Sequence, residues 1–426
     1  MLIVLILLCA FYSAVTLRKH KATGAEGALS LAERVRNEVP AGGSVFVAAG
    51  TTPEDKAFAD TLTRTLTQAG YGVHASQGPP GQARKALAEL PDPPAAIACS
   101  PSTASWSIFD THPDTPRLYP RERLWPDFLK RDNLINIANQ IAVIAILAIG
   151  MTLIIITRGI DLSAGSLLAL SAVATAWFIE QNGAESASAA TMMLASLGGI
   201  AICAAMGFFN GAMVSAFALP PFIVTLSTML IASGIAFDWA DNESIHRLPE
   251  SFNWLGRAAF RLPGIGLRLP VAVALMALLY GLAHFFMMRT VPGRYLYALG
   301  GGPEAARLSG VPVAKVLILA YTAGGAFAGL GGVLMASQLE SGAPTYGLMY
   351  ELKVIAAVVV GGASLSGGSG KIFGTLIGAF IIGVNENGMN LIGIEFGAQK
   401  YVLGAIILAA VLLDRAKRWW LTRLRQ

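Results

Sequence analysis

Long apolar segments with few or no charged residues fill most of this chain, and they restrict it to a membrane fold. About 20 apolar residues cross a bilayer as one helix, because a helix satisfies its own backbone hydrogen bonds inside lipid. The segments are continuously apolar and do not alternate with polar residues, which excludes a transmembrane β-barrel. We therefore predict an all-α polytopic membrane protein with about ten transmembrane helices. The predicted spans are 1–17, 134–157, 162–179, 189–217, 222–237, 269–288, 316–339, 346–362, 372–394 and 396–413.

Charge is scarce in this chain and unevenly placed. Only 13% of the residues are charged, against about 25% in soluble domains. Basic residues cluster in the loop 289–315 and in the tail 415–426. Short loops rich in Lys and Arg stay in the cytoplasm, so we predict both there, with an even number of spans between them. The loop holds Arg289, Arg294, Arg307 and Lys315, and the tail holds Arg415, Lys417, Arg418, Arg423 and Arg425.

The same count of spans places residues 22–133 on the extracytoplasmic side of the membrane. Two features oppose this topology, namely the basic run 18–21 and the four arginines of the loop 241–269. Long loops translocate largely regardless of their charge, so we keep the assignment. Residues 1–21 are predicted to be an uncleaved transmembrane anchor. A cleaved signal is the alternative, but no basic residue precedes the apolar run and no small-residue cleavage pattern follows it.

The polar segment 22–127 has the character of a small α/β domain followed by a linker. Strands alternating with helices predict a parallel βαβαβ sheet. The pattern resembles a fragment of one lobe of a periplasmic sugar-binding protein, although it is too short for a two-lobed cleft. A docking or structural role is favoured over ligand contact by Thr51 or Thr52. The predicted strands are 44–49, 71–75 and 95–99, and the predicted helices are 53–69 and 81–90.

An eight-residue motif occurs twice, as GIDLSAGS at 159–166 and as GASLSGGS at 362–369. Both copies follow a β-branched apolar run and face the same side in the topology, which predicts a parallel internal repeat with the solute passing between the halves. The polar side chains of each elbow are predicted to cap the next helix. An alternative gives Asp161, next to Arg158, a role in an inner gate, because a carboxylate at the membrane edge needs a partner.

The loop 289–315 has the form of a rigid knob that another protein grips. Its core, 300–307, combines glycines, a proline and a short helical Glu-Ala-Ala turn. No nucleotide site accompanies it, because a phosphate loop ending at Lys371 would need glycine at 365 and serine or threonine at 372, where the chain has Leu365 and Ile372. No His, Cys or acidic cluster has metal-ligand or hydrolytic spacing. We predict that this chain is not an enzyme and that energy comes from a partner.

Five motifs, in order over residues 128–414, resemble the ribose-type permease family of ATP-binding-cassette importers. They are MTLIIITRGIDLSAGSLLAL, LPPFIVTLSTML, GRYLYALGGGPEAARLSGVPV, YELKVIAAVVVGGASLSGGSG and NGMNLIG. The resemblance implies a bacterial inner-membrane permease for a monosaccharide such as ribose. It also implies cytoplasmic ATPase subunits, an extracytoplasmic binding protein and a second permease copy as partners. No cofactor is expected on this chain, since ATP and magnesium belong to the ATPase, and no nucleic acid is expected.

The resemblance also carries residue roles and exposes departures. Gly302 stands where the family usually has Asn, Arg158 where Gly is usual, and Lys353 where an acidic residue is common. We expect Gly302 to keep the bend without the cap, and Lys353 to pair with Glu351. The residues implied to dock on the ATPase are Gly301, Pro303, Glu304, Ala305, Ala306, Arg307 and Gly310.

Polar residues inside the apolar spans are candidates for the translocation path, because each needs a partner or water in hydrocarbon. Hydrogen bonding between helices is the competing role for each of them. The candidates for path or gate are Asp161, Ser163, Asn210, Glu351, Ser364, Ser366, Asn387 and Asn390, with Gln140, Asn385 and Glu386 as further polar groups within the spans.

Two other classes of function stay open at this point. The ionisable residues Glu351, Lys353 and Glu386 are compatible with an ion-coupled carrier or channel. An inactive or sensory paralogue is the third possibility. The predicted domains are an anchor at 1–21, an extracytoplasmic insert and linker at 22–127, a permease domain at 128–414 and a basic cytoplasmic tail at 415–426.

Overall fold

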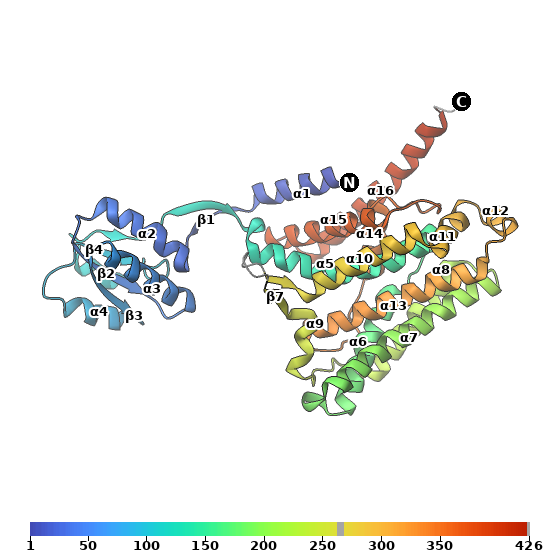
Figure 1. The fold of residues 1–426 in the computed structure, drawn as a ribbon, viewed down its shortest axis with the longest axis horizontal. Helices are drawn as coiled ribbons and strands as arrows, with labels where there is room; N and C mark the ends of the chain where they lie inside the picture. The colour runs from blue at the N-terminus through green and yellow to red at the C-terminus, as the bar shows by residue number, and fades with distance from the viewer. Residues whose placement is uncertain (262–267, 424–426) are drawn as a thin grey trace. The chain divides into compact units, whose positions relative to one another are not determined.

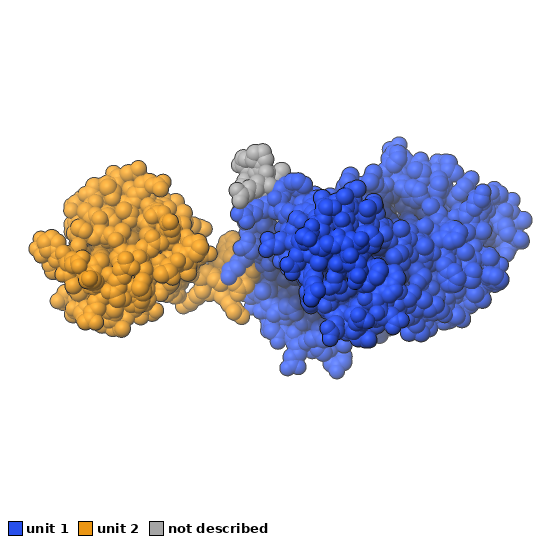
Figure 2. Space-filling view, turned by 90° about the horizontal axis from the view of Figure 1, so that it is seen from below, with its two compact units in different colours: residues 1–16, 128–426 blue, residues 17–127 orange. Residues whose placement is uncertain are grey.

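The computed structural model describes residues 1–261 and 268–423, and the chain divides into two compact units (Figure 2). Unit 1 consists of residues 1–16 and 128–426, and unit 2 of residues 17–127. Helix α1 (Leu2–Val15) belongs to unit 1, whereas residues 17–21, grouped above with the anchor, form strand β1 of unit 2. Arg425 of the basic tail lies outside the described residues.

Unit 1 is a bundle of long apolar helices (Figure 1). Each of the ten predicted spans contains a helix, and among the described residues six helices are long and apolar enough to cross a membrane. These six are α5 (Arg131–Ile156), α7 (Ala189–Ala216), α8 (Pro221–Trp239), α10 (Val271–Arg289), α13 (Val313–Leu339) and α15 (Ile372–Leu391). The others in the predicted spans are α1, α6 (Ala164–Gln181), α14 (Tyr350–Val360) and α16 (Phe396–Arg423).

Helix α14 is much shorter than the span predicted at 346–362. Its 11 residues rise about 16 Å, roughly half the thickness of a hydrocarbon core. The backbone turns before it, with φ of 69° at Gly347 and 67° at Met349. Left-handed residues interrupt a helix, so α14 begins only at Tyr350, and hydropathy alone overstated its length.

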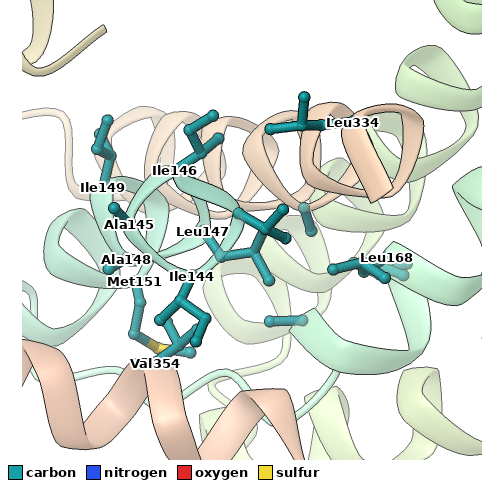
Figure 3. Close-up of a cluster of buried hydrophobic side chains, with 14 of the residues drawn as sticks. Ile144, Ala145, Ile146, Leu147, Ala148, Ile149, Met151, Leu168, Leu334 and Val354 are labelled. Carbon is teal, nitrogen blue, oxygen red and sulfur yellow. The ribbon is translucent and has the colours of Figure 1, made fainter. Parts of the chain in front are cut away.

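Helix α5 is the centre of the bundle. Of the 18 most apolar consecutive residues of α5, 89% are buried, whereas the same share is 28% for α7 and for α8. Those two helices therefore present most of their apolar surface outward. Figure 3 shows Ile144, Leu147 and Met151 of α5 in a buried cluster with Leu168 of α6, Leu334 of α13 and Val354 of α14. A helix that is apolar on every side is stable only when other helices surround it or when it lies in lipid.

Helices α7 and α13 pack with their backbones in contact. Each carries a Gly-x-x-x-Gly pair, Gly207 with Gly211 and Gly325 with Gly329. A Cβ atom on Gly207 would lie 2.2 Å from the carbonyl oxygen of Tyr321, and one on Gly325 would lie 2.1 Å from that of Cys203. Small residues at these crossings let helices associate in lipid, where the hydrophobic effect does not hold them together.

Helix α1 packs on α15 through one aromatic side chain. The ring of Tyr12 covers Gly388, where a Cβ atom would lie 2.4 Å from the ring carbons. The Tyr12 hydroxyl donates to Asn385 Oδ1 at 2.9 Å. Asn387, also on α15, exchanges two hydrogen bonds with Asn133 of α5, at 2.9 and 3.1 Å. Asn385 and Asn387 therefore join helices to one another.

The segment between α8 and α10 is folded, not extended. It contains a short helix α9 (Trp254–Arg257) and the antiparallel strands β7 (Ala259–Arg261) and β8 (Arg268–Pro270), and residues 262–267 lie outside the described residues. The Arg257 guanidinium lies 2.8 Å from the Glu340 carboxylate, and that of Arg247 lies 3.9 Å from Glu180. Two of the four arginines whose positive charge counted against the predicted topology are therefore paired with carboxylates.

Unit 2 contains a four-stranded parallel sheet of order β3-β2-β4-β5. The three predicted strands coincide with β2 (Ser44–Ala49), β3 (Gly72–Gln77) and β4 (Ala96–Cys99), and the two predicted helices with α3 (Pro53–Gln68) and α4 (Pro80–Ala88). Helix α2 (Gly24–Glu38) and strand β5 (Arg117–Leu118) were not predicted. The expected linker ends in β6 (Glu122–Pro126), which pairs antiparallel with β1 (Leu17–Lys21).

A buried carboxylate closes the carboxyl edge of this sheet. Asp55 accepts hydrogen bonds from the hydroxyls of Ser100 and Ser102 at 2.7 Å and of Thr52 at 2.8 Å. Burial raises the pKa of Asp55, but these hydrogen bonds outweigh it and leave the pKa below its ordinary value. The Thr52 side chain also accepts from the Asp55 amide as the N-cap of α3. Thr52 therefore caps α3 and closes the turn after β2.

Candidate functional site

The loop 289–315 folds into two short helices, which we call the α11–α12 hairpin. Thr290 is the N-cap of helix α11 (Val291–Gly301), and its hydroxyl accepts from the amide of Gly293 at 3.2 Å; the helix has a proline in its first turn. Helix α12 (Pro303–Leu308) follows after a single residue, Gly302, in extended conformation. Gly302 occupies the N-cap of α12 without a side-chain cap, as predicted.

The base of the hairpin packs against the end of α5, just before the first elbow, and against the second elbow. A Cβ atom on Gly300 would lie 1.7 Å from the carbonyl oxygen of Ile156 and 2.4 Å from the amide of Gly368. The Gly368 amide donates to the Ile156 carbonyl at 2.9 Å, and the Tyr297 hydroxyl donates to the Gly370 carbonyl at 2.8 Å. Three segments far apart in sequence therefore meet through their backbones at one end of the bundle.

The contacts of Arg158 give a structural reason for one departure from the family pattern, the arginine at a position where glycine is usual. It has a left-handed backbone with φ of 69°, a conformation that favours the glycine usual there. Its guanidinium donates to the carbonyls of Gly300 and Gly301 at 2.8 and 3.0 Å. These are free carbonyls at the carboxyl end of α11, where a cation is also stabilised by the helix dipole. Arg158 therefore joins the elbow to the hairpin and does not partner Asp161.

The tip of the hairpin is exposed. The side chains of Glu304 and Arg307 form an exposed ion pair at 3.2 Å, and Leu308 is 83% exposed. Ala306 is buried and holds the turn against the bundle. Gly310 has φ of 81°, which turns the chain toward α13. The remaining residues predicted to dock on a partner, Gly301, Pro303 and Ala305, are exposed.

The two elbows share a local geometry as well as a motif. In the first, the Asp161 carboxylate accepts from the Ser163 amide at 2.8 Å. In the second, the Ser364 hydroxyl accepts from the Ser366 amide at 3.2 Å. Neither arrangement caps the following helix, since the N-caps of α6 and α15 make no side-chain cap hydrogen bond. The expected capping is therefore wrong, and the polar side chains close the turns instead.

Asp161 leads into a buried polar chain that joins the first elbow to α7 and α8. Ser163 donates to Asp161, Asn210 of α7 donates to Ser163 at 3.4 Å, and Thr228 of α8 donates to Asn210. All four residues are at most 2% exposed. Buried polar groups of this kind fix the helices to one another when each has a partner. Asp161, Ser163 and Asn210 thus lie together, but in the protein interior.

Two adjoining cavities, which we call the chamber, lie between α5, α13, α14, α15 and α16. Each has a volume of about 310 Å³, and both are lined by Met335, Leu339, Tyr350 and Glu386. One continues to Lys353 and Lys400, and the other to Gln140, Gln338 and Asn390. An apolar wall with an aromatic ring, a carboxylate, amides and an ammonium group suits a small polar solute rich in hydroxyls.

Lys353 and Glu386 form an ion pair within the chamber. Their charged atoms lie 2.8 Å apart, and their side chains are 15% and 33% exposed. The expected pairing of Lys353 with Glu351 is wrong, because residues two apart on a helix point in different directions. Glu351 instead faces Gly165 of α6, where a Cβ atom would lie 2.5 Å from its carboxylate, and it lines neither cavity.

The structure places seven of the eight predicted path residues in three groups, and the eighth, Glu351, lies apart from them against α6. Asn390 lies at the chamber, with Gln140 and Glu386. Asp161, Ser163, Asn210, Ser364 and Ser366 belong to the elbows and their buried polar chain. Asn387 joins helices α5 and α15. The sequence analysis did not name Tyr350, Gln338 or Lys400 as chamber residues. Tyr350 could have been found from the sequence, because it lies close to Glu351 and Lys353 at the start of an apolar segment.

A multi-pass helical bundle with a polar chamber and an exposed, rigidly seated hairpin defines the class of membrane transport proteins. The chain belongs to the family described as "Branched-chain amino acid transport system / permease component", whose pattern matches residues 133–411. This match covers the five motifs and leaves out unit 2.

Several named relatives are sugar import permeases. The chain is 40% identical over 301 residues to the ribose import permease protein RbsC of Escherichia coli strain K12, covering 69% of this chain and 89% of that protein. It is 40% identical over 294 residues to the ribose import permease protein of Bacillus subtilis strain 168, covering 68% and 87%. It is 38% identical over 307 residues to the galactose/methyl galactoside import permease protein MglC of Salmonella typhimurium, covering 68% and 89%. No solved structure matches the chain.

Proposed function

We propose that this chain is the membrane-spanning permease subunit of an ATP-binding-cassette importer for a monosaccharide. The observation that carries the proposal is the α11–α12 hairpin, which exposes a charged and apolar tip while its base is fixed to the end of α5, to Arg158 and to the second elbow. A rigid lever of this form transmits the motion of a partner to the helices behind it. The names of the relatives support a ribose-like solute.

The partners follow from this role. Cytoplasmic ATPase subunits that hold ATP and magnesium contact the exposed residues Gly301, Pro303, Glu304, Ala305, Arg307 and Gly310, while the buried Ala306 keeps the turn in place against the bundle. This chain binds no cofactor itself. An extracytoplasmic binding protein delivers the solute, and a second permease copy, identical or related, completes the pathway. The chain crosses the bacterial inner membrane about ten times, with the hairpin and the tail 415–426 in the cytoplasm and residues 22–133 in the periplasm.

The chamber supplies a place for the solute. Glu386, Gln140, Gln338 and Asn390 offer acceptors and donors for sugar hydroxyls, and Tyr350 offers a ring face. The Lys353 ammonium neutralises Glu386, which removes the need for a coupling ion at this carboxylate. The elbow residues Asp161, Ser163, Ser364 and Ser366, with Asn210, hold the inner ends of the helices, and Glu351 and Asn387 position α14 and α15 around the chamber.

Reconstitution tests this proposal directly. Proteoliposomes containing the full chain, its ATPase and its binding protein are expected to accumulate radiolabelled ribose only when ATP is hydrolysed. Solute screening with galactose and fructose in the same vesicles then ranks the monosaccharides. Uptake that follows a proton or sodium gradient without the ATPase would replace the proposal with an ion-coupled carrier.

Reversing the charge at the hairpin tip is expected to uncouple transport. Glu304→Lys places a cation beside Arg307 on a surface built for docking, and like charges across an interface oppose association. ATP-dependent uptake should fall about tenfold or more, while membrane insertion and thermal stability stay unchanged because the Glu304 side chain is 83% exposed.

Glu185→Lys is the matched control for that variant, because Glu185 is an exposed carboxylate in the turn between α6 and α7. ATPase co-purification and uptake are measured for both variants. Equal uptake by the two would contradict the docking role of the hairpin.

A further inference from the structure

A large basic cavity lies beside the base of the α11–α12 hairpin. Its volume is about 1000 Å³, and its lining includes three cationic side chains, those of Arg158, Arg294 and Lys371, and no carboxylate. Among the described residues none of the three cations has a carboxylate oxygen within 4.0 Å. Three cations without counter-charges around one cavity create a strong attraction for an anion.

The rest of the cavity favours an amphipathic ligand. Much of the wall is glycine backbone from the second elbow and α11, which leaves room for a polar headgroup. Met287 and Met288, from the last turn of α10, form an apolar side of the same cavity. Arg158 uses two of its five N–H donors on the carbonyls of Gly300 and Gly301, and guanidinium geometry leaves others for an oxyanion.

An exposed apolar stripe on α10 leads directly to this cavity. Leu278, Leu282, Phe285 and Met288 are 55% to 61% exposed and lie three or four residues apart, on one face of the helix. The His284 and Phe373 rings lie 4.8 Å apart, so the start of α15, next to Lys371, packs beside the end of α10. An apolar surface about three turns long therefore ends at the three cations.

We propose that this cavity binds the headgroup of an anionic phospholipid whose acyl chains lie along the α10 stripe. Charge complementarity selects an anion, and the continuous apolar stripe selects one with hydrocarbon chains over a soluble phosphate. Basic pockets at the ends of membrane helices are suited to such headgroups. The cavity shares no lining residue with the chamber, so the lipid is not the transported solute. The proposal does not depend on which solute the chain carries.

The experiment compares lipids on the purified full chain. The chain in neutral detergent is titrated with dioleoyl phosphatidylglycerol or dioleoyl phosphatidylcholine, and bound lipid is counted by native mass spectrometry. We expect phosphatidylglycerol to bind selectively. Each basic residue near an anionic headgroup contributes about fivefold in affinity, so Arg294→Ala with Lys371→Ala should weaken binding about 30-fold.

Arg84→Ala with Lys85→Ala is the matched control. It removes the same charge from two exposed positions on α4 of unit 2, and phosphatidylglycerol binding should be unchanged. Thermal stability of both double variants shows whether they fold. Soluble sn-glycerol 3-phosphate is added as a competitor and is expected not to displace the lipid at equal concentration.

Four outcomes overturn the proposal. Phosphatidylcholine binding as tightly as phosphatidylglycerol removes the headgroup role. A folded Arg294→Ala, Lys371→Ala variant with unchanged lipid binding places the lipid elsewhere. Full displacement by sn-glycerol 3-phosphate identifies a soluble phosphate site. Loss of ATPase co-purification in the double variant, without any change in lipid binding, assigns the cavity to the partner protein.

Discussion

Replacing Gly300 by alanine is expected to abolish uptake and to destabilise the protein by about 3 kcal/mol. The new methyl carbon would lie 1.7 Å from the Ile156 carbonyl oxygen and 2.4 Å from the Gly368 amide nitrogen. Both atoms belong to backbone, so no side-chain rotation relieves the overlap. The α11–α12 hairpin must move away from the elbows, and Arg158 then loses its two carbonyl acceptors. A hairpin detached at its base cannot transmit the motion of a partner.

Two other glycines provide matched controls for this change. A Cβ atom on Gly301, the next residue, or on Gly281 of α10 would have nothing within 4 Å. Gly301→Ala is expected to keep the thermal stability of the unmodified chain in detergent, and Gly281→Ala is expected to keep both stability and uptake. Thermal midpoints from size-exclusion profiles and ATP-dependent uptake in proteoliposomes measure the two effects. A Gly300→Ala variant as stable as Gly301→Ala would show that the hairpin is not rigidly seated.

The apolar segments of the sequence predict most of unit 1. A long apolar segment that is buried in lipid or protein must satisfy its own backbone hydrogen bonds, and a helix does so within the segment. Hydropathy fails where backbone conformation decides, as at Gly347 and Met349, whose left-handed φ angles shorten α14. In unit 2 the alternation of strands and helices identifies the central strands. The two residues of β5 are too few to carry a periodic signal.

The candidate site is only partly readable from sequence. The hairpin and the elbows are local motifs that the sequence delimits, although nothing local indicates that Gly300 touches Ile156 and Gly368. Polar residues in apolar helices are easy to find, but their partners are not. The Tyr12 to Asn385 hydrogen bond joins residues 373 positions apart. Proximity in sequence paired Lys353 with the wrong glutamate, because helix geometry and not sequence distance sets its direction.

Breaking the Lys353–Glu386 pair is the second large effect we expect. Lys353→Met leaves the Glu386 carboxylate beside the apolar walls of the chamber without its cation, at 33% exposure. Removing one partner of a buried pair costs about 3 to 5 kcal/mol, and partial exposure reduces the expected loss here to about 2 kcal/mol. Lys400→Met is the matched control, because it removes an exposed cation from the same cavity without stranding a carboxylate.

The double variant separates a structural pair from a solute-binding one. Lys353→Met with Glu386→Leu leaves no uncompensated charge, so its thermal stability should return to within about 1 kcal/mol of the original chain. Uptake should nevertheless stay at least about tenfold reduced, since Glu386 lines both cavities and a hydrogen bond to a charged group contributes about 1.5 to 3 kcal/mol. If stability and uptake recovered together, the ion pair would only hold α14 to α15. Recovery of stability alone would make the Glu386 carboxylate part of the path that the solute follows.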